Sequence, residues 1–382
     1  MNLTLRTLFI CALLAVCLRT AVAADSIPIG FHAPLTGFAA GDGKSALQGA
    51  QLAVQQINAA GGIKGRPLEL VVEDDQARAD QALPLANKMI GRGLRIVISG
   101  SYSAPTRAAA GVFQKAKVPY ISAYGLHPDI TKAGNYVFRV SFTGEVQGKA
   151  AAKFIGDNLK RHRVTLITLD NDFGQSLSAG FRDVASRFGL TIVSERTYAM
   201  GDRQFGSVVA SVKHDDPEIL YVSGYFFNGG PLVAQLRAGG VQAPIVGTEG
   251  FDTQDFIAIA KDAAEGVMIT TSLDRDSQAP AMRHFIDDYQ ARYKVPANMV
   301  AAATDTAVTV AAEGLRRAGS DDTAKIRDAI AGIRDFDVAT GRITFNSHGE
   351  VLKAAQIQVI RGGAFHHLAT IDDPVLLAPP AN

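Results

Sequence analysis

The chain has 382 residues, of which 47% are hydrophobic, and its 38 Lys and Arg nearly balance its 37 Asp and Glu, so the formal net charge at pH 7 is +1. This length exceeds the roughly 250 to 300 residues at which a single hydrophobic core stops growing, which favours two lobes. Acidic and basic residues are interspersed, without the basic stripe that nucleic acids or anionic membranes would attract, so neither is expected as a partner.

Residues 1–24 have the pattern of a secretory signal peptide, with a basic Arg6, an apolar run over 8–18, and alanines where a signal peptidase would cut. Arg19 ends the apolar run well short of the about 20 residues that a membrane-spanning helix needs. We therefore expect the leader to be removed and the mature protein, with a formal charge of −1, to be soluble and periplasmic.

The remaining residues offer little for metal or redox chemistry. Both cysteines, Cys11 and Cys17, lie in the leader, so the mature chain has no disulfide or cysteine metal site. The acids at 73–75 alternate in direction on a strand end, and we interpret them as solvated. His366 and His367 lack partners at a useful spacing and fit a surface hairpin better than a metal site. No metal or cofactor is expected.

The first part of the chain alternates short apolar strands with helical patterns. Expected strands are 27–33, 68–73, 95–99 and 119–122, and expected helices are 45–59, 79–92 and 106–116. This alternation predicts crossover connections and a parallel sheet with helices on both faces. The fold class is therefore α/β and doubly wound.

The same alternation begins again at Glu145. Expected strands are 163–169, 190–194, 219–223, 244–247 and 266–271, and expected helices are 145–159, 176–188, 205–213 and 230–238. Three helical patterns follow, and we expect them to complete the first lobe. The tail from Gly341 predicts a strand, a turn over 346–349 and a second strand. Since no Pro- or Ser-rich linker separates the halves, several short crossings are expected to join them.

Two loops that follow strands stand out. The loop 37–45, which contains Asp42, has glycines and a Gly-Lys pair, but five residues in place of four precede that pair, so it does not match a phosphate-binding loop. A ligand-contacting lip is the better interpretation. The loop 100–106 places three hydroxyl residues before a helix, where free N–H groups and the helix dipole would favour a carboxylate. Ligands of doubly wound sheets bind at such strand ends, although Ser103 or Thr106 could merely cap the helix.

The stretch from Ile27 to Asp75 resembles the opening of the type I periplasmic binding proteins that serve ABC importers, in the branched-chain and hydrophobic amino acid class. The string LTG followed by GA-x-LAV-x-x-IN-x-x-GGI-x-G carries this resemblance, and similar stretches extend through Ala260–Thr270 to the Asn346 turn. The resemblance implies two lobes, 25–141 with 270–342 and 142–269 with 343–382, joined by three crossings.

The resemblance also implies a carboxylate site on the first lobe. Ser103 matches a serine that holds the ligand carboxylate, and the loop at 121–131 matches one whose backbone completes that grip. Leu126 stands where the family has a hydroxyl residue, which predicts a more apolar pocket. The residues implied in this half of the site are Asp42, Ser103, Ala104, Thr106, Tyr124, Gly125 and Leu126.

The second lobe is expected to bind the other end of the ligand. Tyr225 and Glu249 each follow a predicted strand, and in the family a tyrosine and a glutamate at these places contact the ligand, the glutamate pairing with its ammonium. A buried carboxylate without a cation is costly, so Glu249 implies a positive group on the ligand. Phe173 stands where the family often has a tyrosine. The alternative interpretation of Glu249 is an ordinary surface residue in a loop.

The resulting prediction is a monomeric solute-binding component of an ABC importer that captures a hydrophobic amino acid by hinge closure and presents it to the permease subunits. It is not expected to be an enzyme, because no acid/base pair or activated nucleophile is evident. Two alternatives keep the fold: a binder of aromatic or aliphatic carboxylic acids, and a ligand sensor for a membrane receptor.

Overall fold

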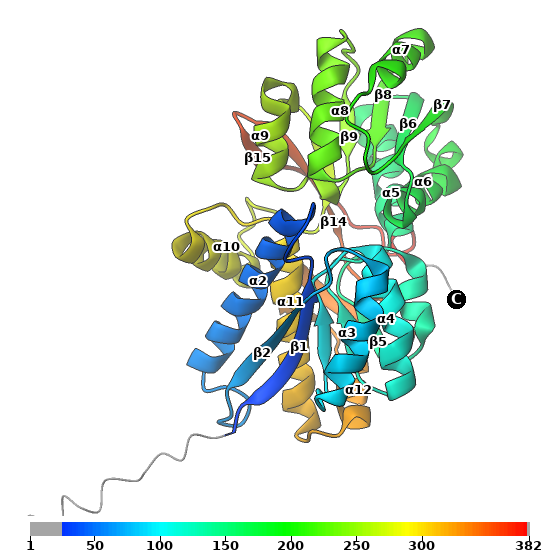
Figure 1. Ribbon diagram of the computed structural model, residues 1–382. Helices are drawn as coiled ribbons and strands as arrows, with labels where there is room; N and C mark the ends of the chain where they lie inside the picture. Colours follow the sequence, from blue (N-terminus) through cyan, green and yellow to red (C-terminus); the bar gives the residue numbers. More distant parts are fainter. Residues whose placement is uncertain (1–24, 380–382) are drawn as a thin grey trace, which may run out of the picture.

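The computed structural model describes residues 25–379, which form two α/β lobes placed end to end (Figure 1). The predicted leader, with Cys11 and Cys17, lies outside the described residues. Within the described part, no helix combines the length and the apolar character that crossing a membrane would require.

Lobe 1 is built on a parallel five-stranded sheet in the order β2-β1-β3-β4-β5. Its strands are β1 (Ile27–Ala33), β2 (Leu68–Asp74), β3 (Val97–Ser99), β4 (Tyr120–Ser122) and β5 (Val137–Arg139). Helices α2 (Ala40–Ala59) and α11 (Met299–Ala318) cover one face, and α3 (Ala79–Gly91) and α4 (Ser103–Ala116) cover the other. The prediction of a doubly wound lobe is confirmed.

Three further helical segments belong to this half of the molecule: η1 (Pro128–Ala133), α10 (Pro280–Tyr293) and α12 (Thr323–Ala331). Helix α10 carries buried apolar residues that join the core around α2, and α12 packs on α11 through Ile326 and Ile330. Helices α10, α11 and α12 therefore pack on the core around the lobe 1 sheet.

Lobe 2 has a seven-stranded sheet in the order β15-β14-β10-β9-β8-β6-β7. The parallel strands are β6 (Arg163–Leu169), β7 (Thr191–Tyr198), β8 (Ile219–Val222), β9 (Ile245–Gly247) and β10 (Met268–Thr271). The strands β14 (Ala355–Arg361) and β15 (Ala364–Ile371) add an antiparallel hairpin that carries His366 and His367. The tail was expected to contribute two strands, but its second part folds into this longer hairpin.

The helices of lobe 2 also cover both faces of their sheet. One face has α5 (Gly144–Lys153), η2 (Phe154–Leu159), α6 (Asp172–Val184) and η3 (Ser186–Phe188). The other has α7 (Gly206–Asp215), α8 (Phe226–Ala238), η4 (Glu249–Phe251), α9 (Gln254–Ala260) and η5 (Lys261–Ala264).

The chain passes between the lobes three times: after β5, after β10, and after a small sheet of β11 (Phe336–Val338), β12 (Gly341–Phe345) and β13 (Val351–Leu352). The expected divisions at 269/270 and 342/343 fall inside β10 and β12. Phe345 packs edge-on against Phe138 of lobe 1, so β12 stays with that lobe. We therefore move the divisions to 271/272 and to the segment 346–354.

Several helices begin earlier than their sequences indicated. Helices α2, α4, α6 and α8 start at residues 40, 103, 172 and 226, three to five residues before the expected positions. Their first turns are rich in Gly, Ser and Asn, which are typical of loops, yet these residues also cap and begin helices. Asn171, for example, accepts a hydrogen bond from the Gly174 amide at 2.9 Å. The loops after these strands are therefore shorter, and Asp42, Ser103 and Phe173 lie in first helical turns.

Candidate functional site

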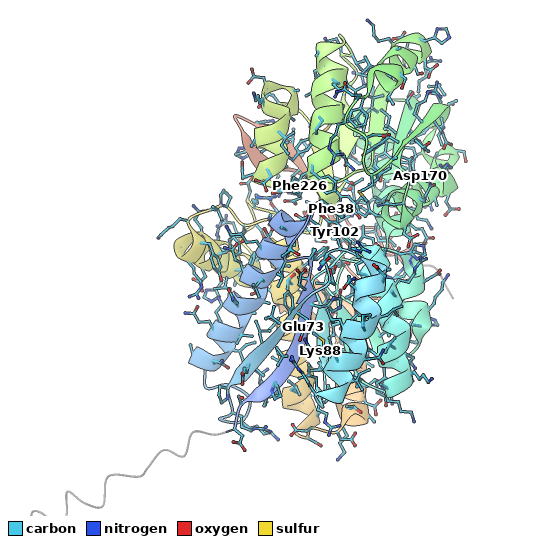
Figure 2. All side chains as sticks on the ribbon, in the orientation of Figure 1. Phe38, Glu73, Lys88, Tyr102, Asp170 and Phe226 are labelled. Atoms are coloured by element: carbon cyan, nitrogen blue, oxygen red, sulfur yellow. The ribbon has the colours of Figure 1, made fainter. Side chains whose placement is uncertain are left out.

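The carboxyl ends of both sheets face each other across the junction of the lobes, and the helices that follow the strands begin there. Figure 2 shows Phe38 and Tyr102 of lobe 1 meeting Phe226 of lobe 2 at this junction. A cavity lies between them, lined by Asp42, Tyr102, Ser103, Tyr124, Phe173, Tyr225, Glu249, Gly250, Asp252, Thr253, Met299 and Val300. The two lobes therefore contribute the two halves of one site.

Aromatic rings from both lobes stack inside the cavity. The Tyr102 and Tyr225 ring centroids are 4.3 Å apart at an interplanar angle of 12°, and Phe173 stacks on Tyr225 at 4.7 Å. Tyr124 meets Tyr102 edge-on at 6.3 Å. Near the rim, Phe38 touches Phe227 of lobe 2 edge-on at 5.4 Å. The Tyr102–Tyr225 and Phe38–Phe227 contacts cross the cleft and hold the lobes in a closed arrangement, whereas the other two lie within one lobe.

The remaining space is small. About 20 Å³ is open to the centre of a water molecule, which is room for about one water. A ligand the size of an amino acid therefore enters only when the rings or the lobes move apart.

Asp42 provides a carboxylate on the lobe 1 side, in the first turn of α2. Its Oδ2 accepts a hydrogen bond from the Tyr102 hydroxyl at 2.6 Å. Burial raises the pKa of Asp42 to about 7, and the charges of Asp255 and Asp252 raise it further against that hydrogen bond. The position costs energy when Asp42 is ionised, which favours a positive group nearby.

Glu249 provides a second carboxylate, at the first residue of η4 in lobe 2. Burial raises the pKa of Glu249 to about 8, while the positive charge of Lys353 opposes that shift. Glu249 Oε2 and Lys353 Nζ are both buried without a hydrogen-bond partner among the described residues. Lys353 therefore moderates the charge of Glu249 from a distance without occupying the carboxylate, and a surface position for Glu249 is excluded.

Gly250 lets η4 approach the loop after β8. A Cβ at this position would lie 2.0 Å from the Gly224 carbonyl oxygen and 3.3 Å from the Phe173 ring. The backbone next to Glu249 thus packs where no side chain would fit, which fixes the direction of the carboxylate.

Asp252 connects the cavity to a crossing segment. It is buried, accepts a hydrogen bond from the Thr271 hydroxyl, and forms an ion pair with Arg275, which lies between β10 and α10. Arg275 also donates to Gln358 Oε1 of β14 at 2.7 Å. The third acid of the site is therefore paired within the protein, unlike Asp42 and Glu249.

Six of the residues predicted from the sequence line the cavity: Asp42, Ser103, Tyr124, Phe173, Tyr225 and Glu249. They come from two lobes and from positions up to about 200 residues apart, and the strand-end rule explains why they meet.

The other four predicted residues do not line the cavity. Ala104 is exposed on α4, and the buried Thr106 directs its hydroxyl to the Tyr102 carbonyl at 2.7 Å and to Ser99 at 2.7 Å. The Gly125 carbonyl accepts from Arg139 at 2.6 Å, and the Leu126 amide donates to Ser103 Oγ at 3.0 Å. Their polar groups are thus used inside lobe 1. Thr106 lies within α4 and does not cap it, because the N-cap position is Tyr102.

The sequence did not single out Tyr102, Gly250, Asp252, Thr253, Met299 or Val300. Tyr102 lies in the predicted loop 100–106, but its neighbours drew attention as hydroxyl donors, and its ring is what the cavity uses. Met299 and Val300 begin α11, which reaches the cleft because it packs along α2. No local signal marks them.

A buried polar network supports the lobe 1 loop. Asp75 was expected to be solvated, but it is fully buried, 2.6 Å from His32 Nδ1, and accepts a hydrogen bond from the Ser101 hydroxyl at 3.0 Å. His32 in turn lies 2.8 Å from the Tyr120 hydroxyl. Since its partner His32 is 43 positions away in the chain, the burial of Asp75 has no local sequence signal.

Two hinged α/β lobes with a buried cavity between their strand ends define a ligand-binding protein of the periplasmic type. The profile of the family described as "Periplasmic binding protein" matches residues 26–364. The chain belongs to this family, and the resemblance found in its sequence is confirmed.

The relatives of the chain include amino-acid-binding proteins. The Leucine-, isoleucine-, valine-, threonine-, and alanine-binding protein of Pseudomonas aeruginosa is 30% identical over 331 residues, covering 86% of this chain and 88% of that protein. The branched-chain amino acid transporter substrate binding protein of Streptococcus pneumoniae, solved with isoleucine, has a TM-score of 0.84 at 28% identity, covering 91% and 99%.

A solute binding protein of an ABC transporter from Rhodopseudomonas palustris, solved with 3,4-dihydroxy benzoic acid, has a TM-score of 0.83 at 21% identity, covering 91% and 98%. At this identity the similarity supports the fold alone. The same two-lobed architecture thus accommodates ligands with and without an ammonium group, and the side chains of the site must decide between them.

Proposed function

We propose that this protein is the solute-binding component of an ABC importer and that its ligand is an α-amino acid. The family assignment and the names of the relatives support the transport role. The location that goes with it is the periplasm, reached through the predicted leader at residues 1–24, and we expect a monomer. The ligand assignment is supported by the chemistry of this chain's own cavity.

The two buried carboxylates that lack a bonded cation carry the ligand assignment. Asp42 and Glu249 both line the cavity. Lys353 is the cation whose charge acts most strongly on Glu249, but its Nζ has no hydrogen bond to either carboxylate. A ligand ammonium would supply the missing charge and the missing hydrogen bonds. A simple carboxylic acid would instead add a carboxylate to the cavity without supplying a cation for either Asp42 or Glu249, which disfavours the benzoate-like alternative.

The proposed mechanism is hinge closure about the three crossings. Lobe 1 offers the Ser103 hydroxyl at the start of α4, where the helix dipole favours a ligand carboxylate. Closure then brings Glu249 and Tyr225 of lobe 2 onto the other end. Because no bond is made or broken, the ligand acts only through its different affinities for the open and closed forms.

Calorimetric titration of the leaderless protein with matched ligand pairs tests this proposal. Phenylalanine is compared with 3-phenylpropanoate and leucine with 4-methylpentanoate, since each pair differs only in the ammonium group. We expect the acids to bind at least about 30-fold more weakly, because loss of a buried charge partner typically costs about 2–5 kcal/mol. Equal or tighter binding of the acids would contradict the proposal.

Glu249→Gln is the matched variant for this titration. It should bring the two members of each pair close to equal affinity, since the partner of the ammonium is gone. Glu195→Gln is the control, because Glu195 lies on the exposed side of β7 in an ion pair with Arg182. This control should leave the affinities unchanged. Recovery of the ligand in unaltered form after prolonged incubation would further support binding without catalysis.

A further inference from the structure

The stacking of Tyr102 on Tyr225 is a feature of the cavity to which the proposed function assigns no role for the ligand side chain. Tyr102 precedes the first turn of α4 in lobe 1, and Tyr225 precedes the first turn of α8 in lobe 2. Their rings lie nearly parallel, 12° apart in orientation, at a centroid distance of 4.3 Å. Each ring is thus carried by a different lobe, and opening of the hinge separates them.

Both rings are held in place from within their own lobes. Phe173 stacks on Tyr225 at 19°, and Phe227 lies 5.6 Å from Tyr225 at 18°. Tyr102 is supported by the edge of Tyr124, whose hydroxyl donates to the Gly100 carbonyl at 2.6 Å. Because these supports belong to the same lobe as the ring that they contact, the two tyrosines keep their orientation when the lobes part.

A planar group fits between such rings better than a branched one. Opening by about one ring thickness, on the order of 3.5 Å, leaves two parallel aromatic faces at stacking distance from a flat group inserted between them. A flat aromatic ring or a guanidinium plane gains contact on both faces, whereas a branched aliphatic side chain is thicker and has no π face to offer.

The edge of this slot holds an acceptor. Asp42 lines the cavity and already accepts the Tyr102 hydroxyl hydrogen, so its carboxylate lies at the phenol end of one slot wall. As a first-turn acid of α2, Asp42 could serve only the helix dipole, but an acid with that role alone would lie in solvent, and this side chain is 7% exposed. An N–H or O–H group on the ligand side chain would give it a second hydrogen bond.

We propose that the cavity selects amino acids with a planar side chain, which inserts between Tyr102 and Tyr225 and donates a hydrogen bond to Asp42. The inference rests on the proposed function, because it assigns the ammonium end to Glu249 and the side-chain end to this slot. It names a class that comprises tryptophan, tyrosine, histidine and arginine and leaves out the branched aliphatic amino acids.

The chain contains no tryptophan, so the emission of an indole ligand can be followed without protein background. Tryptophan is titrated into the wild-type protein, and the other amino acids are then tested as competitors or, where tryptophan does not bind, directly by calorimetry. We expect at least one of the four planar amino acids to bind about tenfold or more tightly than leucine, isoleucine and valine. Aliphatic amino acids binding as tightly as every planar one would overturn the inference and leave the proposed function standing.

Two variants test the assignment of residues. Tyr102→Leu removes one wall and should reduce the preference for planar over aliphatic ligands to less than about threefold, whereas Tyr293→Leu removes a lobe 1 tyrosine outside the cavity and should retain it. Asp42→Asn should weaken tyrosine binding more than phenylalanine binding, because only tyrosine has a donor. Unchanged selectivity in Tyr102→Leu would overturn the slot, and binding of simple carboxylates alone would overturn both proposals.

Discussion

Two buried charged regions of this molecule differ in how completely their charges are paired. At the hinge, Arg139 is fully buried and donates to both Glu350 oxygens, to the Gly125 carbonyl and to the His127 carbonyl, while Thr131 donates to Glu350 at 2.5 Å. In the cleft, Glu249 has a buried carboxylate oxygen without a partner among the described residues. The hinge pair is complete without a ligand, whereas we propose that a ligand completes the cleft.

This difference separates architecture from function in the same fold. Arg139 comes from β5 and Glu350 from the turn before β13, so the pair joins the first crossing to the third. Its partners also fix the loop at 125–127, whose backbone was expected to grip a ligand. A buried ion pair with all its hydrogen bonds stabilises one arrangement, while incompletely paired carboxylates leave binding energy for another molecule.

The largest expected effect is on the hinge. Arg139→Met leaves Glu350 buried without its cation and the Gly125 and His127 carbonyls without their donor. We expect a loss of about 3–5 kcal/mol in the free energy of unfolding. Chemical denaturation at pH 7 measures it. A loss below about 1 kcal/mol would mean that the pair is not structural, and the comparison with the cleft would fail.

In the cleft, removal of a buried charged group should raise the free energy of unfolding instead of lowering it. The folded-state pKa of Glu249, about 8, exceeds its ordinary 4.5, so the folded protein binds more protons and its stability falls as pH rises through this window. Glu249→Gln removes that term and should add up to about 4 kcal/mol to the free energy of unfolding at pH 8 and less than about 1 kcal/mol at pH 5. Denaturation curves at both values test this, and destabilisation at pH 8 would contradict it.

Ligand affinity should depend on pH for the same reason. Because a ligand ammonium favours the ionised form of Glu249, binding should tighten by up to about tenfold per pH unit between about pH 6 and 8. Asp42, whose pKa is raised to about 7, acts in the same sense. Titrations across this range should show the slope in the wild type and a shallower one in Glu249→Gln, and equal slopes would show that Glu249 is not the coupled group.

The smallest effect is expected at the rim. Arg107 of α4 and Asp172 of α6 form an ion pair across the cleft at 2.8 Å, but both side chains are partly exposed. Arg107→Gln should therefore change affinity by less than about 1 kcal/mol, and the change should shrink in high salt. A larger loss of affinity that does not depend on salt would show that this ion pair, and not the aromatic contacts alone, stabilises the closed form.

The fold could be predicted because alternating strands and helices are a local signal that both lobes retain. Half of the site could be predicted because Ser103, Tyr225 and Glu249 follow strands and match positions of the family that the sequence resembles. Tyr102 was overlooked because its neighbours matched a hydroxyl pattern, and Met299 because its role depends on how α11 packs against α2. The completeness of charge pairing, which distinguishes Glu350 from Glu249, depends on contacts between distant residues and has no signature in either segment.

The most direct test of the proposal that the cleft carboxylates lack a cation until a ligand binds is the number of protons exchanged when an amino acid binds. Calorimetric titrations at pH 7 in buffers of different ionisation enthalpy give this number. Release of protons, approaching one per ligand in the wild type and clearly less in Glu249→Gln, would show that the ligand's ammonium replaces protons on buried carboxylates. No exchange, or uptake of protons, would show that the ligand does not pair a cation with Glu249 and would contradict the proposed role of this carboxylate.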